Sequence, residues 1–263
     1  MALALRAEWT KLRTLAGTWW LLLGAVALTI AVSAAAAATF SCQPGACVAQ
    51  QTGADPAKLS LTGVFLGQVV IALLAVLAIG GEYGTGMIRL TLTAVPRRLT
   101  AFTAKALVTG AGALAAAVLA VGGSALAGWL ILPGKGLIAA NGYVPLALGN
   151  AADLRAAGGT VLYLTLIALL AFGVTTAVRD SAAGIGIVLG VLFVLPIMSA
   201  VIPDHALSRH LEQIAPMTAG LYIQATEGIS QLPLTPWQGL GITALWALGA
   251  LLLGAAVLRL RDA

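Results

Sequence analysis

Charged residues are scarce in this chain: Asp, Glu, Lys and Arg make up only 9% of its 263 residues. Because a soluble globular domain carries about 25% charged residues, this composition excludes an ordinary soluble domain. Hydrophobic residues instead make up 60% of the sequence, and the mean hydropathy is +1.00. We therefore predict an integral membrane protein. The net charge of +5 indicates contact with membrane lipid rather than with nucleic acid, because the basic residues lie beside apolar segments.

Ionisable side chains are missing from the central part of every long apolar segment. Carriers driven by protons or sodium generally use such side chains as relays or ligands, so their absence argues against self-powered transport. The sequence has no Gly-x4-Gly-Lys-Ser/Thr phosphate-binding loop, and no nucleophile–base pair is evident in the apolar segments. We therefore expect neither an enzyme nor a cofactor bound by this chain. The two histidines, His205 and His210, have a spacing that suits no usual helical metal pair, so no metal site is expected.

Cysteine is almost absent, since the chain has only Cys42 and Cys47. Both fall in a loop that we place outside the cell, where a disulfide between them is compatible with the oxidising surroundings. Two free thiols remain the alternative. Four intervening residues and the lack of a nearby histidine argue against zinc.

Six apolar segments are long enough to cross a bilayer as helices, which takes about 20 residues. None alternates with a two-residue period, so we predict an all-α integral membrane fold rather than a barrel, as one domain over residues 1–263. The third segment is longer than needed, so it should tilt, kink near Gly122-Gly123 or extend beyond the bilayer. The segments are residues 18–40, 61–81, 101–132, 160–178, 182–202 and 237–258.

The charges predict the orientation of these spans. Six spans place both termini on one side, which then holds ten cations and four acids, a net charge of +6. The other side holds four cations and five acids, a net charge of −1. Because Lys and Arg are enriched in cytoplasmic loops, both termini are predicted to lie in the cytoplasm.

Two segments outside the spans show further patterns. Residues 2–16 read as an amphipathic interfacial helix that lies in the headgroup plane; a solvated start of the first span is the alternative. Its apolar face has Leu5, Trp9, Leu12 and Ala16, and its polar face has Arg6, Thr10 and Arg13. Residues 203–236 mix apolar and polar positions, which predicts short helices or a re-entrant hairpin packed against the outer mouth. Gly63-x3-Gly67 and Gly186-x3-Gly190 are small-residue patterns that allow close helix approach.

Residues 82–98 form the longest polar, basic interruption between two apolar segments. Their motifs are Glu82-Tyr83, Thr85-Gly86, Ile88-Arg89 and Pro96-Arg97-Arg98, followed by Ala104-Lys105, and the chain start has Glu8-Trp9-Thr10-Lys11-Leu12-Arg13-Thr14 and Thr18-Trp19-Trp20. With these motifs the chain resembles, over its full length, permease subunits of type-2 ABC exporters, especially the short stand-alone permeases of high-GC Gram-positive (actinobacterial) bacteria. Gly84 departs from many relatives, which carry a charged residue there.

The resemblance implies a concrete assembly in the bacterial cell membrane. Two permease copies, most simply a homodimer, would form the pore, and two separate ABC ATPase subunits would bind ATP and Mg²⁺ beneath them. Glu82 would sit at the cytoplasmic helix end and bond to neighbouring elements. The residues implied to couple to the ATPase are Glu82, Tyr83, Gly84, Thr85, Gly86, Met87, Ile88 and Arg89. Arg97, Arg98 and Lys105 would anchor the third span at the membrane surface. The alternative is that the arginines only enforce topology.

The cargo implied is amphipathic or lipid-like: a drug, a peptide antibiotic, a lipid or a glycoconjugate. Helix position suggests a substrate path along Phe65, Gln68, Ile71, Phe193 and Met198. For Gln68, an interhelical hydrogen bond is an equally good explanation. Two other function classes remain open: a non-transport ABC-type subunit that acts mechanically on a cell-envelope partner, and a membrane enzyme.

Overall fold

The computed structural model describes residues 2–14, 16–40, 55–88, 98–138, 143–147 and 149–260. Within these ranges the regular secondary structure is helical and no strand occurs. Among the helices of the described residues, six are long and apolar enough to cross a membrane. The prediction of an all-α membrane fold with six spans is therefore confirmed at the level of helix number, length and composition.

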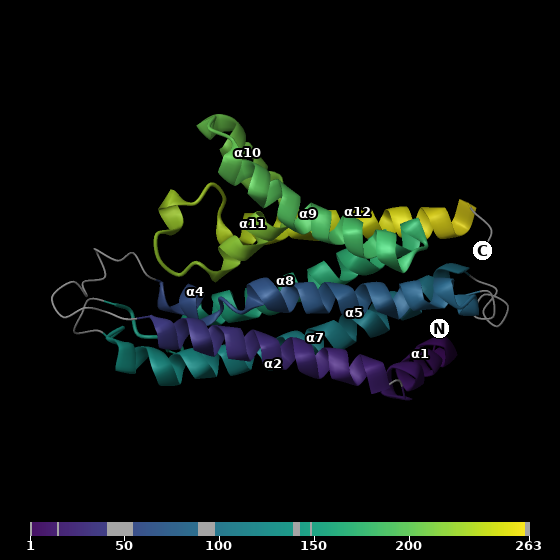
Figure 1. Ribbon diagram of the computed structural model, residues 1–263, viewed down its shortest axis with the longest axis horizontal. Helices are drawn as coiled ribbons and strands as arrows, with labels where there is room; N and C mark the ends of the chain where they lie inside the picture. Colours follow the sequence, from purple (N-terminus) through teal and green to yellow (C-terminus); the bar gives the residue numbers. More distant parts are fainter. Residues whose placement is uncertain are drawn as a thin grey trace.

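The spanning helices are α2, α5, α7, α8, α9 and α12, and the shorter elements lie between or before them (Figure 1). The bounds are α1 Ala2–Thr14, α2 Ala16–Thr39, α4 Pro56–Ser60, α5 Val64–Gly84, α7 Arg98–Ile131, η1 Leu132–Lys135, α8 Ala151–Val178, α9 Ser181–Val201, α10 His205–Ile214, α11 Pro216–Leu221, η3 Tyr222–Gln224, η4 Ile229–Gln231 and α12 Pro236–Leu260. The prediction of short helices within residues 203–236 is confirmed.

Several helix ends differ from the predicted spans. α8 begins well before residue 160, because the Asn150 side chain caps it by accepting a hydrogen bond of 3.2 Å from the Ala152 N–H. α5 begins at Val64, after a turn, and continues to Gly84. α7 runs through Gly122-Gly123 as one helix of 34 residues. At 1.5 Å per residue it is roughly 51 Å long, which exceeds a hydrocarbon core of about 30 Å.

Helix α8 lies at the centre of the bundle, packed against α5, α7 and α12. Its side chains from Tyr163 to Phe172 supply much of the buried core. Small residues let backbones approach closely: a Cβ on Gly173 would lie 2.5 Å from the Ala250 carbonyl carbon in α12. Gly63 and Gly67 likewise face α2, whereas Gly186 and Gly190 have no atom within 4 Å of a Cβ position.

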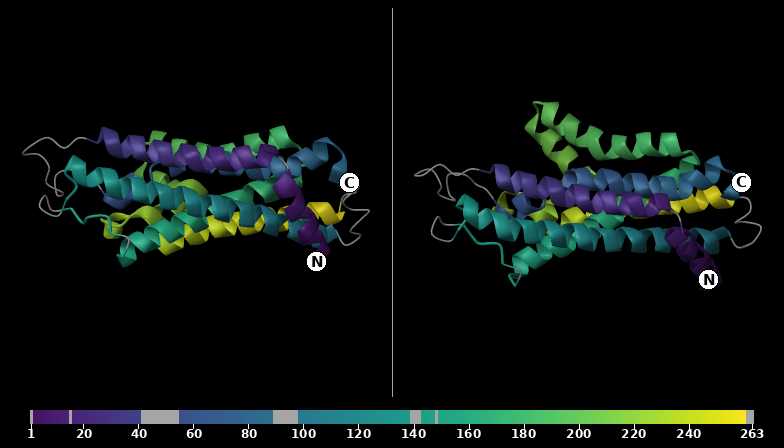
Figure 2. Two further views of the ribbon diagram at one scale, coloured as in Figure 1. Left: turned by 90° about the horizontal axis from the view of Figure 1, so that it is seen from below. Right: turned by 60° about the horizontal axis from the view of Figure 1, so that its bottom comes forward.

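Both ends of the described chain lie at the same end of the bundle (Figure 1). We call this the basal end; it holds α1, the last turns of α5, α8 and α12, and the first turns of α7 and α9. The opposite, distal end holds α4, α10 and α11. Helix α1 lies across the basal ends of the long helices rather than continuing the axis of α2 (Figure 2). This placement positions α1 beside Glu82 of α5 and Lys105 of α7.

Candidate functional site

The residues implied to couple to an ATPase begin inside helix α5. Glu82, Tyr83 and Gly84 form its last turn rather than a separate loop. The chain then turns at Gly86, whose φ of 71° lies in the left-handed region that glycine tolerates best. The Gly86 N–H donates to the Tyr83 carbonyl at 3.2 Å, which closes the helix end. A Thr-Gly step at this position therefore has a local structural reason.

The first residue after this turn is exposed, and the next one is buried. Met87 is 44% exposed, while the neighbouring Ile88 is buried at 5% exposure and joins the main core. Residues 89–97 lie outside the described ranges. The predictions for Arg89 and Arg97 therefore stay predictions.

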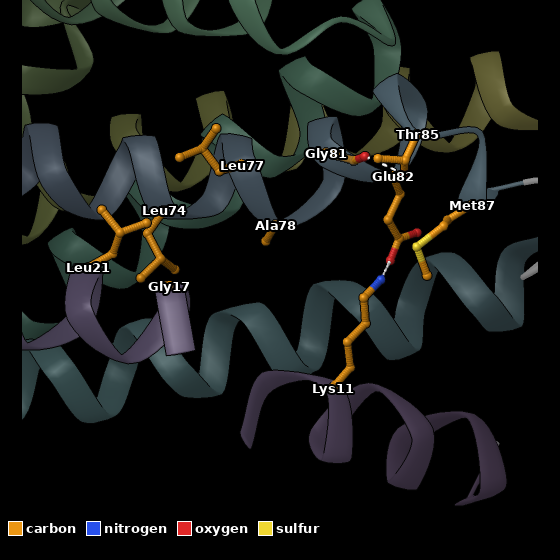
Figure 3. Close-up of a pocket in the computed structure, with 10 residues that line it drawn as sticks. All are labelled: Lys11, Gly17, Leu21, Leu74, Leu77, Ala78, Gly81, Glu82, Thr85 and Met87. Atoms are coloured by element: carbon orange, nitrogen blue, oxygen red, sulfur yellow. Dashed lines mark hydrogen bonds and ion pairs between the residues drawn. The ribbon is translucent and has the colours of Figure 1, made fainter. Parts of the chain in front are cut away.

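A buried ion cluster joins α5 to two other helices immediately before this turn. Glu82 Oε1 accepts hydrogen bonds from Lys11 of α1 and, at 2.6 Å, from Lys105 of α7. Lys105 also donates to Glu8 Oε1 of α1 at 2.6 Å. The Glu82 and Lys105 side chains are only 4% and 5% exposed. Figure 3 shows Lys11 rising from α1 to meet Glu82. The arrangement locks α1, α5 and α7 together at the basal end.

The charges of this cluster balance, with two carboxylates facing two ammonium groups. Burial strengthens their attraction because the surroundings screen charge less than water does. A buried charge that lost its partner would be strongly destabilising for the same reason. Glu82 Oε2 is also buried, and no described group hydrogen-bonds to it. Removal of any one member should therefore disturb the packing of all three helices.

Sequence reasoning found only part of this cluster. It placed Glu82 at a helix end that bonds to its neighbours, and the structure has that arrangement. Glu8 and Lys11 were noted only as a motif, although their spacing of three puts them on one helix face. Lys105 was predicted to be a surface anchor, yet it is buried. The reason is that α1 folds over it and supplies the carboxylate of Glu8.

Two arginines tie the basal end of α12 to the other helices. Arg98 donates to the Leu258 carbonyl at 3.2 Å, and Arg179 donates to the Val257 carbonyl at 3.1 Å. The last carbonyls of a helix have no partner within it and favour nearby positive charge. Arg98, predicted to be a membrane-surface anchor, thus bonds to a helix end within the protein.

A cavity of about 390 Å³ lies beside the ion cluster, between α2 and α5 (Figure 3). Its walls are mostly apolar, and its charged end is formed by Lys11 and Glu82. The residues that line it are Lys11, Gly17, Leu21, Leu74, Leu77, Ala78, Gly81, Glu82, Thr85 and Met87. The cavity can accommodate an apolar group with a polar head, and it adjoins the exposed turn.

The residues predicted to form a substrate path lie in different settings. Gln68 is fully buried; its Oε1 accepts from the Tyr163 hydroxyl of α8, and its Nε2 donates to Met217 Sδ of α11 at 3.3 Å. This is the interhelical hydrogen bond that sequence left as the alternative. Ile71 is buried as well, Phe193 is half-buried, and Phe65 and Met198 are exposed.

A second polar network at the distal end was not anticipated from the sequence. The Asp55 carboxylate caps α4 through the Ala57 and Lys58 N–H groups, at 3.0 and 3.2 Å. It also accepts from the Thr226 N–H at 2.6 Å, the Thr226 hydroxyl at 2.7 Å and the Glu227 N–H at 3.1 Å. One carboxylate therefore joins the start of α4 to the segment before α12.

Tyr222 and Glu212 form a further polar contact at the distal end. The Tyr222 hydroxyl donates to Glu212 at 3.4 Å. Burial, together with the neighbouring Glu212 carboxylate, raises the pKa of Tyr222 to about 12, so the phenol stays protonated under physiological conditions.

The predicted Cys42–Cys47 pair lies outside the described residues. Among the residues that the structure describes, no group of three or more His, Cys, Asp or Glu side chains is placed to hold a metal.

Comparison of the sequence with protein-family models and with curated proteins gave no match.

Proposed function

We propose that this chain is the membrane permease subunit of an ABC exporter, powered by a separate ATPase. The six apolar helices support a multi-pass membrane protein. The resemblance of residues 8–20 and 82–105 to permease subunits of type-2 ABC exporters is the reason for proposing this family. The observation that carries the proposal is the bonding of Glu82 to Lys11 and Lys105, directly before the exposed turn. A partner that pushed this turn would move α1, α5 and α7 together.

A permease that does not itself hydrolyse ATP needs such a connection to its ATPase. Closure of two ATPase subunits, with ATP and Mg²⁺ between them, would displace the turn at Thr85-Gly86. The ion cluster would pass that displacement to the helices as a rigid movement. Under this proposal the basal end faces the cytoplasm of a bacterial cell. Two copies of the chain would enclose a path for an amphipathic or lipid-like cargo.

The proposal is tested by co-reconstituting the full chain with candidate ABC ATPase subunits. Met87→Asp places a charge on the exposed turn, and Leu207→Asp on distal α10 is the matched control, since these residues are 44% and 48% exposed. We expect Met87→Asp to weaken ATPase association about tenfold, as loss of a central apolar contact does. Leu207→Asp should leave association unchanged. Arg89→Glu tests the adjoining charged position.

Normal association and transport by both Met87→Asp and Arg89→Glu would refute the coupling assignment. Stimulation of the ATPase by an amphipathic substrate would separate an exporter from a subunit that acts mechanically on a cell-envelope partner. Failure of any ABC ATPase to bind the unaltered chain would refute the family assignment itself.

A further inference from the structure

An apolar groove runs along the outside of the bundle beneath α1, between α2 and α7. Its main part is a cavity of about 350 Å³ whose walls include Trp9 of α1, Trp19 and Leu23 of α2, and Ala115 and Leu119 of α7. Four of these side chains are large and about half exposed or more: Trp9 57%, Trp19 50%, Leu23 57% and Leu119 64%. We call this feature the α1 groove. Its exposed apolar walls require an apolar environment or an apolar occupant.

The basal mouth of the α1 groove carries a positive charge. A second hollow continues the same wall, sharing Trp9 and Ala111, and adds Arg6 of α1 and Leu107 of α7. The Arg6 side chain is exposed, and no described residue forms an ion pair with it. The acid nearest in sequence, Glu8, is bound to Lys105. An occupant with a negative head and an apolar tail therefore matches the groove.

The length of the α1 groove agrees with one lipid chain. Along α7 it extends from Leu107 to Leu119, which is roughly 18 Å at 1.5 Å per residue. Half of a hydrocarbon core of about 30 Å is roughly 15 Å. Helix α1 crosses the basal end of α7 (Figure 2), so it lies at the level where the headgroup of such a lipid would be. Trp9 has the amphipathic character that suits this boundary.

We propose that the α1 groove binds one anionic phospholipid from the leaflet on the basal side. One acyl chain lies between α2 and α7, and the phosphate lies against Arg6, whose planar guanidinium can bind two phosphate oxygens. A zwitterionic lipid fits less well because it brings its own cation to the same place. This inference does not rest on the transport function, since it concerns a lipid held at the outer surface of the bundle.

The test uses tryptophan quenching by lipids with brominated acyl chains. A basal reporter keeps Trp9 and Trp19, with the other tryptophans changed to phenylalanine. A distal reporter keeps Trp129, Trp237 and Trp246. Each is reconstituted with brominated phosphatidylglycerol or brominated phosphatidylcholine in an unbrominated background. We expect the basal reporter to prefer the anionic lipid about fivefold, the effect of one arginine near a membrane surface. The distal reporter should show no preference.

Two variants and one control test where the lipid binds. Arg6→Gln should reduce the anionic preference of the basal reporter to about one, whereas Arg209→Gln, on exposed distal α10, should leave it unchanged. Ala115→Phe should fill the groove and lower quenching by both lipids. In the chain with all its tryptophans, native mass spectrometry should detect one retained phosphatidylglycerol, which Arg6→Gln releases.

Equal quenching of the basal reporter by both lipids would overturn the proposal. So would an anionic preference that survives Arg6→Gln, because the lipid would then be an ordinary member of the surrounding bilayer. Unchanged quenching in Ala115→Phe would overturn the placement of the acyl chain.

Discussion

Substitution of Glu82 by glutamine should destabilise the fold more than neutralisation of Glu8, the other carboxylate of the basal ion cluster. Glu82 holds both Lys11 and Lys105, and the Glu82 side chain is 4% exposed. Removing one partner of a buried ion pair costs about 3–5 kcal/mol. Lys105 would keep Glu8, and Lys11, at 30% exposure, would reach water. We therefore expect the lower end, about 3 kcal/mol.

Two other substitutions provide the comparison for the loss of unfolding free energy in Glu82→Gln. Glu8 is 18% exposed and makes one bond, to Lys105, so Glu8→Gln should cost about 1 kcal/mol. Lys58→Gln, at an exposed distal position, is the control and should stay within about 0.5 kcal/mol of the unaltered chain. In a double-mutant cycle, Glu82 should couple more strongly to Lys105 than to Lys11, because Lys105 is the more buried.

The free energy of unfolding is measured by titrating mixed micelles with SDS and monitoring helix content by far-ultraviolet circular dichroism. Hydrogen exchange should show faster exchange in residues 2–14 of Glu82→Gln, because α1 loses a buried attachment. The reasoning is refuted if Glu82→Gln unfolds at the same free energy as Lys58→Gln. It is also refuted if exchange in α1 is unchanged.

Three further predictions concern other contacts. Gln68→Leu should cost about 1–3 kcal/mol of unfolding free energy, because the buried Tyr163 hydroxyl loses its acceptor; addition of Tyr163→Phe should restore part of that loss. Asp55→Ala removes a helix cap and three bonds to the 226–227 segment, so it should cost about 2 kcal/mol and speed protease cleavage of that segment. Gly239→Ala should cost about 1–3 kcal/mol, because a Cβ there would lie 2.0 Å from a backbone oxygen of α11. Gly241→Ala, on the same helix but with nothing within 4 Å, should be neutral or stabilising, and a cost as large as that of Gly239→Ala would contradict this account.

Composition and the length of the apolar segments are enough to predict a membrane protein with six spans. Long apolar segments without central charges can satisfy their backbone groups in a bilayer only as helices. The same reasoning located the polar interruption after the second span and marked Glu82 at its edge. Local spacing also predicted an N-terminal helix, since the hydrophobic pattern of residues 2–16 repeats with the helical period.

Which charges meet depends on how the helices pack against one another. Glu8, Glu82 and Lys105 are far apart along the chain, and nothing in their local sequence records that α1 folds across α5 and α7. The same holds for Asp55 and the 226–227 segment, which come together only when the distal ends of the helices are assembled. Periodicity reports which face of a helix is apolar, whereas partner choice depends on how whole helices pack. For that reason Lys105, read from the sequence as a surface anchor, is instead a buried bridge between two carboxylates.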